Sequence, residues 1–326
     1  MRLISYNTFL LHVELPRPGG PIRIGAKPAW RARAAEIGRA LAGRYDIAAL
    51  SEVFDEPELR MVLAAWDGRP AAQAVGPERT RIPMVGKSSG LLTITDGLPV
   101  VRRAARRFRA KGAHWRDADA FASKGVLLVE VDVGAPGNLE VYSTHLIAGN
   151  DFLKGPSGPA AVVTVRHQQV NELVAFVRET HSPGNVALVV GDFNVPADDP
   201  HLNVPSREYE RLRRALGAEG FDDVWAEHGH GPGFTICHGQ PGDVCSPDPD
   251  TPEYCAEPAE PTPGTRPARI DFAWLQRRHP DHLLSATVTS VRRRSFPRSS
   301  GADGFEAAPF LSDHVALDLE LDVGPP

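Results

Sequence analysis

Lysine and cysteine are scarce in this sequence, and long hydrophobic runs are absent. Only five of its 36 basic residues are lysine, and the net charge is −5, so the chain lacks the overall positive field that holds nucleic acid. No apolar run approaches the ~20 residues of a transmembrane helix. Met1 is followed at once by a strand-like segment and not by a secretory signal. We therefore expect either an intracellular protein or one whose signal has been removed.

The three cysteines fall within a single stretch. Cys237, Cys245 and Cys255 lie between residues 229 and 267, a segment rich in Pro and Gly that we expect to form a long surface insertion. The spacing lacks the paired C-x₂-C pattern of a zinc site. We therefore expect one disulfide among the three, with one thiol left over.

Hydrophobic periodicity predicts strands and helices that alternate irregularly. Strands are expected at 2–11, 46–50, 90–95, 102–111, 124–133, 139–146, 186–190, 269–275, 284–292 and 315–323. Helices are expected at 30–42, 55–66, 165–180 and 206–218, the last capped by Ser206. A hairpin is expected between 124–133 and 139–146, and a Gly/Pro-rich loop at 16–28. This irregular order favours a mixed α and β fold over strict βαβ repeats.

The stretch VALVVGDFNVPADDP, residues 186–200, carries the strongest chemical signal. Its apolar run predicts a strand buried on both faces. Asp192 and Asn194 follow on alternate positions, so their side chains leave the strand end on the same side. A carboxylate and an amide placed in this way suit a phosphate ester held near a metal. The alternative is an ordinary Asx turn after a strand.

Similar polar residues lie in or beside five other predicted strands. They are Asn7, Glu52, His145, Asp271 and the pair Asp313 and His314. One polar interruption of a strand is common, but six with metal-ligand or acid–base character indicate strands that converge on one site.

These residues belong to six short motifs: SYN, SEV, STHL, GDFN, RID and SDH, in this order. Together they resemble the endonuclease/exonuclease/phosphatase superfamily. Within it, SEVFDE, SKGVLLVEV, STHL and RHQQVNEL are most similar to the neutral, bacterial-type sphingomyelinases. The resemblance implies an α+β fold, a four-layer α/β/β/α sandwich of two mixed β-sheets flanked by helices. We expect residues 1–326 to form a single catalytic domain that carries the insertion at about 229–267.

The resemblance also implies a Mg²⁺-dependent phosphodiesterase, with Mn²⁺ or Co²⁺ as substitutes. Glu52, assisted by Asn7, would hold the metal, and Asp313 would bind a second metal or serve structure. His314 would take the proton from the attacking water, and Asp271 would orient its imidazole. The remaining assignments are Asp192 for positioning the water, and Asn194 and His145 for binding the phosphoryl oxygens. His145 is also a candidate acid for the leaving group, and the sequence does not decide which histidine is acid and which is base.

Three functions stay open. The first is a phospholipid phosphodiesterase acting on a substrate such as sphingomyelin at a membrane surface. Phe296, Phe305 and Phe310, which precede the SDH motif, would then form an apolar rim, unless they are core residues. The second is a nuclease or another phosphate-ester hydrolase, which the basic segment at 102–111 favours and the net charge disfavours. That segment is otherwise a solvated strand face.

The third function is a non-catalytic binding module. No protein partner is evident from the sequence. The sphingomyelinase resemblance favours a secreted protein, whereas the lack of a signal leaves a cytoplasmic location open.

Overall fold

The computed structural model describes residues 1–10, 13–15, 22–24, 30–69, 71–76, 88–111, 123–148, 159–198, 204–236, 268–297 and 310–325. Two mixed β-sheets of six strands each form its centre. The strand order is β13-β14-β1-β4-β6-β5 in the first sheet and β11-β12-β10-β9-β8-β7 in the second. A separate two-stranded sheet consists of β2 (Val13–Leu15) and β3 (Ile22–Ile24).

The strands of the first sheet are β1 (Arg2–Asn7), β4 (Ile47–Ser51), β5 (Ala72–Val75), β6 (Leu92–Asp96), β13 (Ser285–Arg294) and β14 (Ala316–Gly324). Those of the second are β7 (Val100–Arg107), β8 (Gly125–Val131), β9 (Leu139–His145), β10 (Val186–Asp192), β11 (Phe221–Asp223) and β12 (Asp271–Gln276). The helices are α1 (Trp30–Leu41), α2 (Glu56–Leu63), α3 (Pro159–Thr180), α4 (Arg207–Gly217) and α5 (Val224–His228), with a 3₁₀ turn, η1, at Ala64–Trp66.

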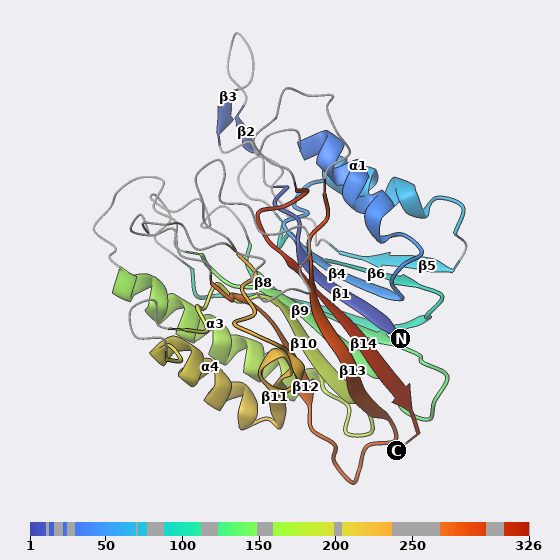
Figure 1. Cartoon of the computed structure of the whole chain (residues 1–326), viewed down its shortest axis with the longest axis vertical. Coiled ribbons are helices and arrows are strands. Elements are labelled where there is room, and N and C mark those ends of the chain that lie inside the picture. The colour runs from blue at the N-terminus through green and yellow to red at the C-terminus, as the bar shows by residue number, and fades with distance from the viewer. Residues whose placement is uncertain are drawn as a thin grey trace.

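The layers follow from three hydrophobic clusters. One contains inward-facing residues of both sheets, including Leu3 and Ile47 from the first and Val129 and Leu188 from the second. The other two lie on the outer faces, under α1 and α2 on the first sheet and under α3 and α4 on the second. Figure 1 shows α1 on one side of the strands and α3 and α4 on the other. The predicted four-layer α/β/β/α sandwich is therefore confirmed.

Each sheet contains one parallel pair of strands near its middle. β1 runs parallel to β4, and β9 runs parallel to β10. The register places Asn7 opposite Ser51 and His145 opposite Asp192, at the carboxyl ends of the strands. β12 and β14 are antiparallel to their neighbours, so they begin where those strands end. Residues at the start of β12 and just before β14 therefore lie at the same edge of the sheets as Asn7, His145 and Asp192.

Most predicted elements are present. In α1, Ala34, Ile37 and Leu41 are buried as its spacing predicts. Ser206 caps α4, because its Oγ accepts a hydrogen bond from the amide of Tyr209. β8 and β9 pair antiparallel, as the predicted hairpin requires. The loop predicted at 16–28 is wrong at β3, because a three-residue strand with Gly and Pro nearby leaves no readable periodicity.

The predicted insertion begins too early. Thr235 is fully buried, and its Oγ1 accepts hydrogen bonds from the amides of Ile270 and Asp271, each at 3.1 Å. Ile236 forms isolated bridges with Ala268 and His314. This part of the segment is therefore pinned to the core and is not a surface loop. Residues 237–267, with the predicted disulfide, lie outside the described residues.

For Phe296, the structure supports the alternative of a core residue and not the apolar rim. Its side chain is only 5 % exposed and packs against Tyr6, with ring centroids 5.4 Å apart. Phe310 is half-buried and pairs through its backbone with Pro297. Phe305 lies outside the described residues. Phe296 belongs to the hydrophobic cluster under α1, and burial there removes more of its apolar surface from water than an exposed rim position would.

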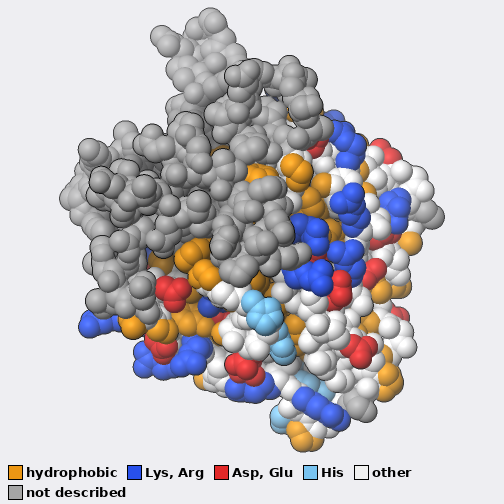
Figure 2. All heavy atoms as spheres, viewed as in Figure 1, with side chains coloured by type: hydrophobic (Ala, Val, Ile, Leu, Met, Phe, Trp, Pro, Cys, Tyr) orange, Lys and Arg blue, Asp and Glu red, His pale blue; other side chains and the backbone are white. Residues whose placement is uncertain are grey.

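Charged side chains of both signs are interspersed on the surface. On the face shown in Figure 2, basic and acidic side chains lie next to one another. Several are paired, for example Arg277 with Asp222 and Arg213 with Glu210. None of the helices in the described parts of the chain is long and apolar enough to cross a membrane.

Candidate active site

The predicted site residues lie where strands of both sheets end or begin. Asn7, His145 and Asp192 are the last residues of β1, β9 and β10, and Asp271 is the first residue of β12. β10 packs across the interface against β1 and β4, which brings the two parallel pairs together. Between the sheets, the hydroxyls of Thr93 and Ser143 are hydrogen-bonded at 3.1 Å.

The amide of Asn7 links carboxylates from the two sheets. Its Nδ2 donates to Asp192 Oδ2 at 2.9 Å and to Glu52 Oε1 at 3.4 Å. Its Oδ1 accepts a hydrogen bond from the amide of Phe9 at 3.0 Å, which fixes the orientation of the side chain. Asn7 and Glu52 therefore lie in one hydrogen-bonded network, to which Asp192 also belongs.

Three residues around these side chains have left-handed backbone conformations. Phe9, Glu52 and Asn194 have φ values of 53°, 63° and 51°. Non-glycine residues adopt this region rarely, and such residues collect at functional sites. The chain therefore turns sharply just after β1, β4 and β10, where the proposed chemical groups are placed.

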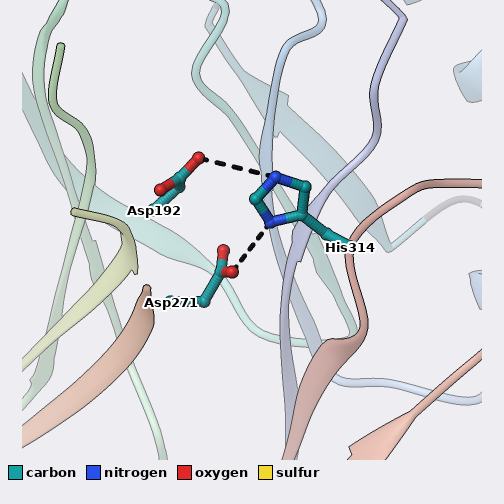
Figure 3. Close-up of side chains that lie close together, drawn as sticks. All are labelled: Asp192, Asp271 and His314. Atoms are coloured by element: carbon teal, nitrogen blue, oxygen red, sulfur yellow. Dashed lines mark hydrogen bonds and ion pairs between the residues drawn. The ribbon is translucent and has the colours of Figure 1, made fainter. Parts of the chain in front are cut away.

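Asp192, Asp271 and His314 form a buried cluster (Figure 3). His314 Nδ1 lies 2.8 Å from Asp271 Oδ2, and its Nε2 lies 3.9 Å from Asp192 Oδ2. The two aspartates face each other in the β10–β12 register. One ligand atom of each residue lies within 4.8 Å of the others.

The electrostatics of the cluster favour a bound cation. Burial lowers the pKa of His314, but the carboxylates of Asp271, Asp192 and Asp313 outweigh it and raise that pKa to about 10. Burial, together with the negative charge of Asp271, raises the pKa of Asp192 to about 7. Two adjacent buried carboxylates need positive charge to ionise fully. Together with Asn7 and Glu52 they form an oxygen-rich donor set that fits Mg²⁺.

His145 has a cationic neighbour that the sequence prediction missed. The ammonium of Lys124 lies 2.6 Å from His145 Nε2, which is also 3.4 Å from Asp192 Oδ2. Burial, Lys124 and His314 hold the pKa of His145 well below its usual range. Its imidazole is therefore neutral, with Nε2 accepting from Lys124 and the proton on Nδ1. The signal that could have found Lys124 is its place directly before Gly125, which pairs with His145.

Asn194 and Asp313 have more local contacts. The amide of Asn194 donates to Asp192 Oδ1 at 2.9 Å, which is the predicted alternative of an Asx turn. Its side chain donates to the carbonyl of Leu146 and so joins β10 to the end of β9. The Asp313 carboxylate is 3.5 Å from Ser312 Oγ and lies outside the cluster of Figure 3. Asp313 thus lies beside the cluster and is not a member of it.

Sequence and structure comparisons identify the family and the fold. Residues 4–314 match the profile of the Endonuclease/Exonuclease/phosphatase family, so the chain belongs to this family. Enzymes of the superfamily are hydrolases that act on phosphoester bonds. No curated protein sequence matches the chain significantly.

Solved structures share the fold at low sequence identity. Sphingomyelinase C from Streptomyces griseocarneus is 18% identical, covers 98% of each chain and has a TM-score of 0.61. A beta-toxin variant from Staphylococcus aureus with bound magnesium ions is 15% identical, again over 98% of each chain, with a TM-score of 0.62. TDP2 from C. elegans is 14% identical over 98% of this chain and 74% of its own, with a TM-score of 0.56.

Proposed function

We propose that the protein is a divalent-metal-dependent phosphodiester hydrolase. The observation that carries this proposal is the buried Asp192–Asp271–His314 cluster, which Asn7 joins to Glu52. A general base paired with a carboxylate, beside a set of oxygen donors, is what hydrolysis of a phosphate ester needs.

Glu52 and Asn7 would hold Mg²⁺, with Mn²⁺ and Co²⁺ as substitutes. When bound, the ion would neutralise phosphate charge and stabilise the leaving oxygen. Asp192 lies beside them, because its Oδ2 accepts a hydrogen bond from Asn7 Nδ2 at 2.9 Å, and its carboxylate would be a third oxygen ligand. Asp313, half-buried beside Ser312, would support a second metal or the backbone of the loop.

His314 would take the proton from the attacking water. Without a cation, the three carboxylates that raise its pKa to about 10 keep the imidazole protonated, and a cation bound beside Asp192 would offset their charge and lower that pKa. Its Nδ1 faces Asp271, which leaves Nε2 as the atom that receives the proton. Asp192 Oδ2 lies 3.9 Å from that Nε2, so a water held by Asp192 would lie beside the base. Asp271 would then stabilise the imidazolium as it forms.

His145 and Asn194 would bind the phosphoryl oxygens, and Lys124 would add positive charge there. Because the pKa of His145 is held low, its imidazole is neutral at pH 7 and acts as a hydrogen-bonding group. A leaving-group proton would come more readily from the neighbouring ammonium of Lys124, 2.6 Å from Nε2.

The preferred substrate is a phospholipid with a phosphorylated head group, such as sphingomyelin. Two arguments support it: the motifs SEVFDE, SKGVLLVEV and RHQQVNEL resemble sphingomyelinases, and sphingomyelinase C shares the fold over nearly its whole length. The burial of Phe296 removes one element of the expected apolar rim.

A nucleic acid is the second candidate, and one observation favours it. β7 pairs with β8, and β8 pairs with β9, so Arg107, Gly125 and His145 lie in line across the sheet. The basic segment therefore ends near the site, although Arg102 and Arg106 are engaged in ion pairs with Glu140 and Glu179. The likeness to TDP2 concerns the fold alone.

Parallel assays of one protein preparation test the proposal. The substrates are sphingomyelin vesicles, phosphatidylcholine vesicles, plasmid DNA and bis(p-nitrophenyl) phosphate, each with Mg²⁺, and Asp192→Asn is the inactive control. We expect phosphocholine release from sphingomyelin, and Asp192→Asn abolishes it. Cleavage of DNA without any phospholipid cleavage would move the substrate to the nuclease class. No hydrolysis of any substrate would contradict the proposed function.

A further inference from the structure

Arg33 is a buried arginine on α1 whose guanidinium contacts the backbone of two distant loops. Its side chain is 3 % exposed. Nη1 donates to the carbonyls of Thr8 at 3.2 Å and Leu311 at 2.8 Å, and Nη2 donates to the carbonyl of Phe9 at 2.5 Å. The guanidinium also lies 5.5 Å from the ring centroid of Phe9.

The three carbonyls belong to the loops that present Asn7 and His314. Thr8 and Phe9 directly follow Asn7, and Leu311 precedes the SDH motif. Ser312 adds a second connection, because its Oγ donates to the carbonyl of Asn7 at 2.7 Å and accepts from the amide of His314 at 3.1 Å. Segments about three hundred residues apart in sequence are therefore joined at one point.

The β1–β14 ladder does not join these two loops. Its register runs from Arg2 opposite Glu320 to Ser5 opposite Leu317 and ends there. Beyond it, Asn7 pairs with Ser51 of β4, and His314 forms a bridge with Ile236. Arg33 and Ser312 connect the two loops to each other where the β1–β14 ladder stops.

We infer that Arg33 is a positioning residue of the proposed phosphodiesterase, which holds the Asn7 loop and the His314 loop at a fixed separation. This inference rests on the proposed function. Arg33 reaches the three carbonyls from two nitrogens of a planar fork, a spread that the single nitrogen of a lysine ammonium does not span. A displacement of about 1 Å in a catalytic group costs roughly a hundredfold in rate.

The activity test compares Arg33→Lys with Arg39→Lys, an exposed arginine on the same helix. With Mg²⁺ and bis(p-nitrophenyl) phosphate, we expect Arg33→Lys to lower kcat between about ten- and a hundredfold. Arg39→Lys stays within twofold (about the error of the assay). Millimolar guanidinium restores activity to Arg33→Ala, and methylammonium does not. Wild-type kcat in Arg33→Lys contradicts the inference.

A second readout does not depend on activity. The imidazole signals of His314, assigned with His314→Gln, are compared by NMR between the wild type, Arg33→Lys and Arg39→Lys at one pH. We expect them to shift in Arg33→Lys alone. If the wild type hydrolyses no phosphodiester but this shift is present, the proposed function fails and the positioning role stands. Unshifted His314 signals in a folded Arg33→Lys variant contradict that role.

Ser312→Ala covers the case in which Arg33 variants do not fold. It removes the second connection between the same two loops and leaves the buried guanidinium in place. We expect shifted His314 signals and a lower kcat with an unchanged far-UV spectrum. Wild-type signals and kcat would show that the loops keep their separation without these contacts.

Discussion

At the scale of single residues, Glu52 tests the proposed metal site. Glu52→Gln keeps the size of the side chain and removes one negative charge from the donor set. We expect Mg²⁺-supported activity to fall about a hundredfold or more while the thermal midpoint changes by no more than a few degrees. Glu56→Gln, an exposed glutamate four residues later, is the matched control and retains activity. Full activity in Glu52→Gln would exclude this residue as a ligand.

His314 and Asp271 test whether a paired base is at work. Because their side chains are hydrogen-bonded at 2.8 Å, they act as a unit, and their losses do not multiply. We expect the double variant His314→Ala with Asp271→Asn to be little slower than His314→Ala alone, measured as kcat/KM on bis(p-nitrophenyl) phosphate. Independent, multiplicative losses would show that the carboxylate does not serve this histidine.

At the scale of elements, Gly191 controls how β10 lies against β9. Its φ is 139°, and a Cβ there would lie 1.9 Å from the carbonyl oxygen of Thr144. We expect Gly191→Ala to lower the free energy of unfolding by about 2 kcal/mol or more, measured by urea denaturation. Gly217 on α4 has open space around it, so Gly217→Ala changes stability by less than about 1 kcal/mol. Equal effects of both substitutions would refute this role of Gly191.

Glu140, at the start of β9 and far from His145 at its end, makes the stability of the fold depend on pH. Its buried carboxylate accepts hydrogen bonds from Arg102, Tyr142, Ser182 and Asn185 and pairs with His181. Burial raises the pKa of Glu140, but the hydrogen bonds of this network outweigh it and hold the pKa below its usual 4.5. The ionised carboxylate therefore stabilises the fold fully above pH 4.5, and this stabilisation is lost as the pH falls through the lower, folded-state pKa.

Urea denaturation over a pH series checks this assignment. We expect Glu140→Gln to be less stable than the wild type by about 3 kcal/mol at pH 7. The difference should narrow below pH 4.5. Glu227→Gln, at an exposed position on α5, is the control and follows the wild type throughout. A constant difference between wild type and Glu140→Gln down to pH 3 would contradict the assignment.

At the scale of the whole molecule, the sequence shows which polar residues end strands better than it shows how the strands assemble into sheets. Asp192 and His145 could be found because each ends an apolar run, and the ends of parallel strands meet at one edge. Arg33 could not, because its role depends on contacts with carbonyls about three hundred residues apart in the sequence, whereas Lys124 could have been found from its place at the end of the predicted hairpin. The division of the strands into two sheets also depends on contacts between distant segments. The family resemblance implied this division, whereas hydrophobic periodicity did not.

The sequence predicted the burial of residues in loop-like segments poorly. The sequence places Thr235 in an insertion and leaves Phe296 open between rim and core, and the structure packs both into the core. Neither residue shows this in its local sequence, because Pro and Gly neighbours resemble loops whether or not the chain is held by tertiary contacts.

The central claim is that phosphodiester hydrolysis depends on a divalent cation held by Glu52 and Asn7 beside the Asp192–Asp271–His314 cluster. The most direct measurement is the rate of bis(p-nitrophenyl) phosphate hydrolysis by metal-stripped protein as Mg²⁺ is added, with His314→Ala run in parallel. We predict no activity in excess chelator, a saturable return of activity with Mg²⁺ in the wild type, and none in His314→Ala. Wild-type activity that persists in chelator, or equal rates in His314→Ala, would contradict it.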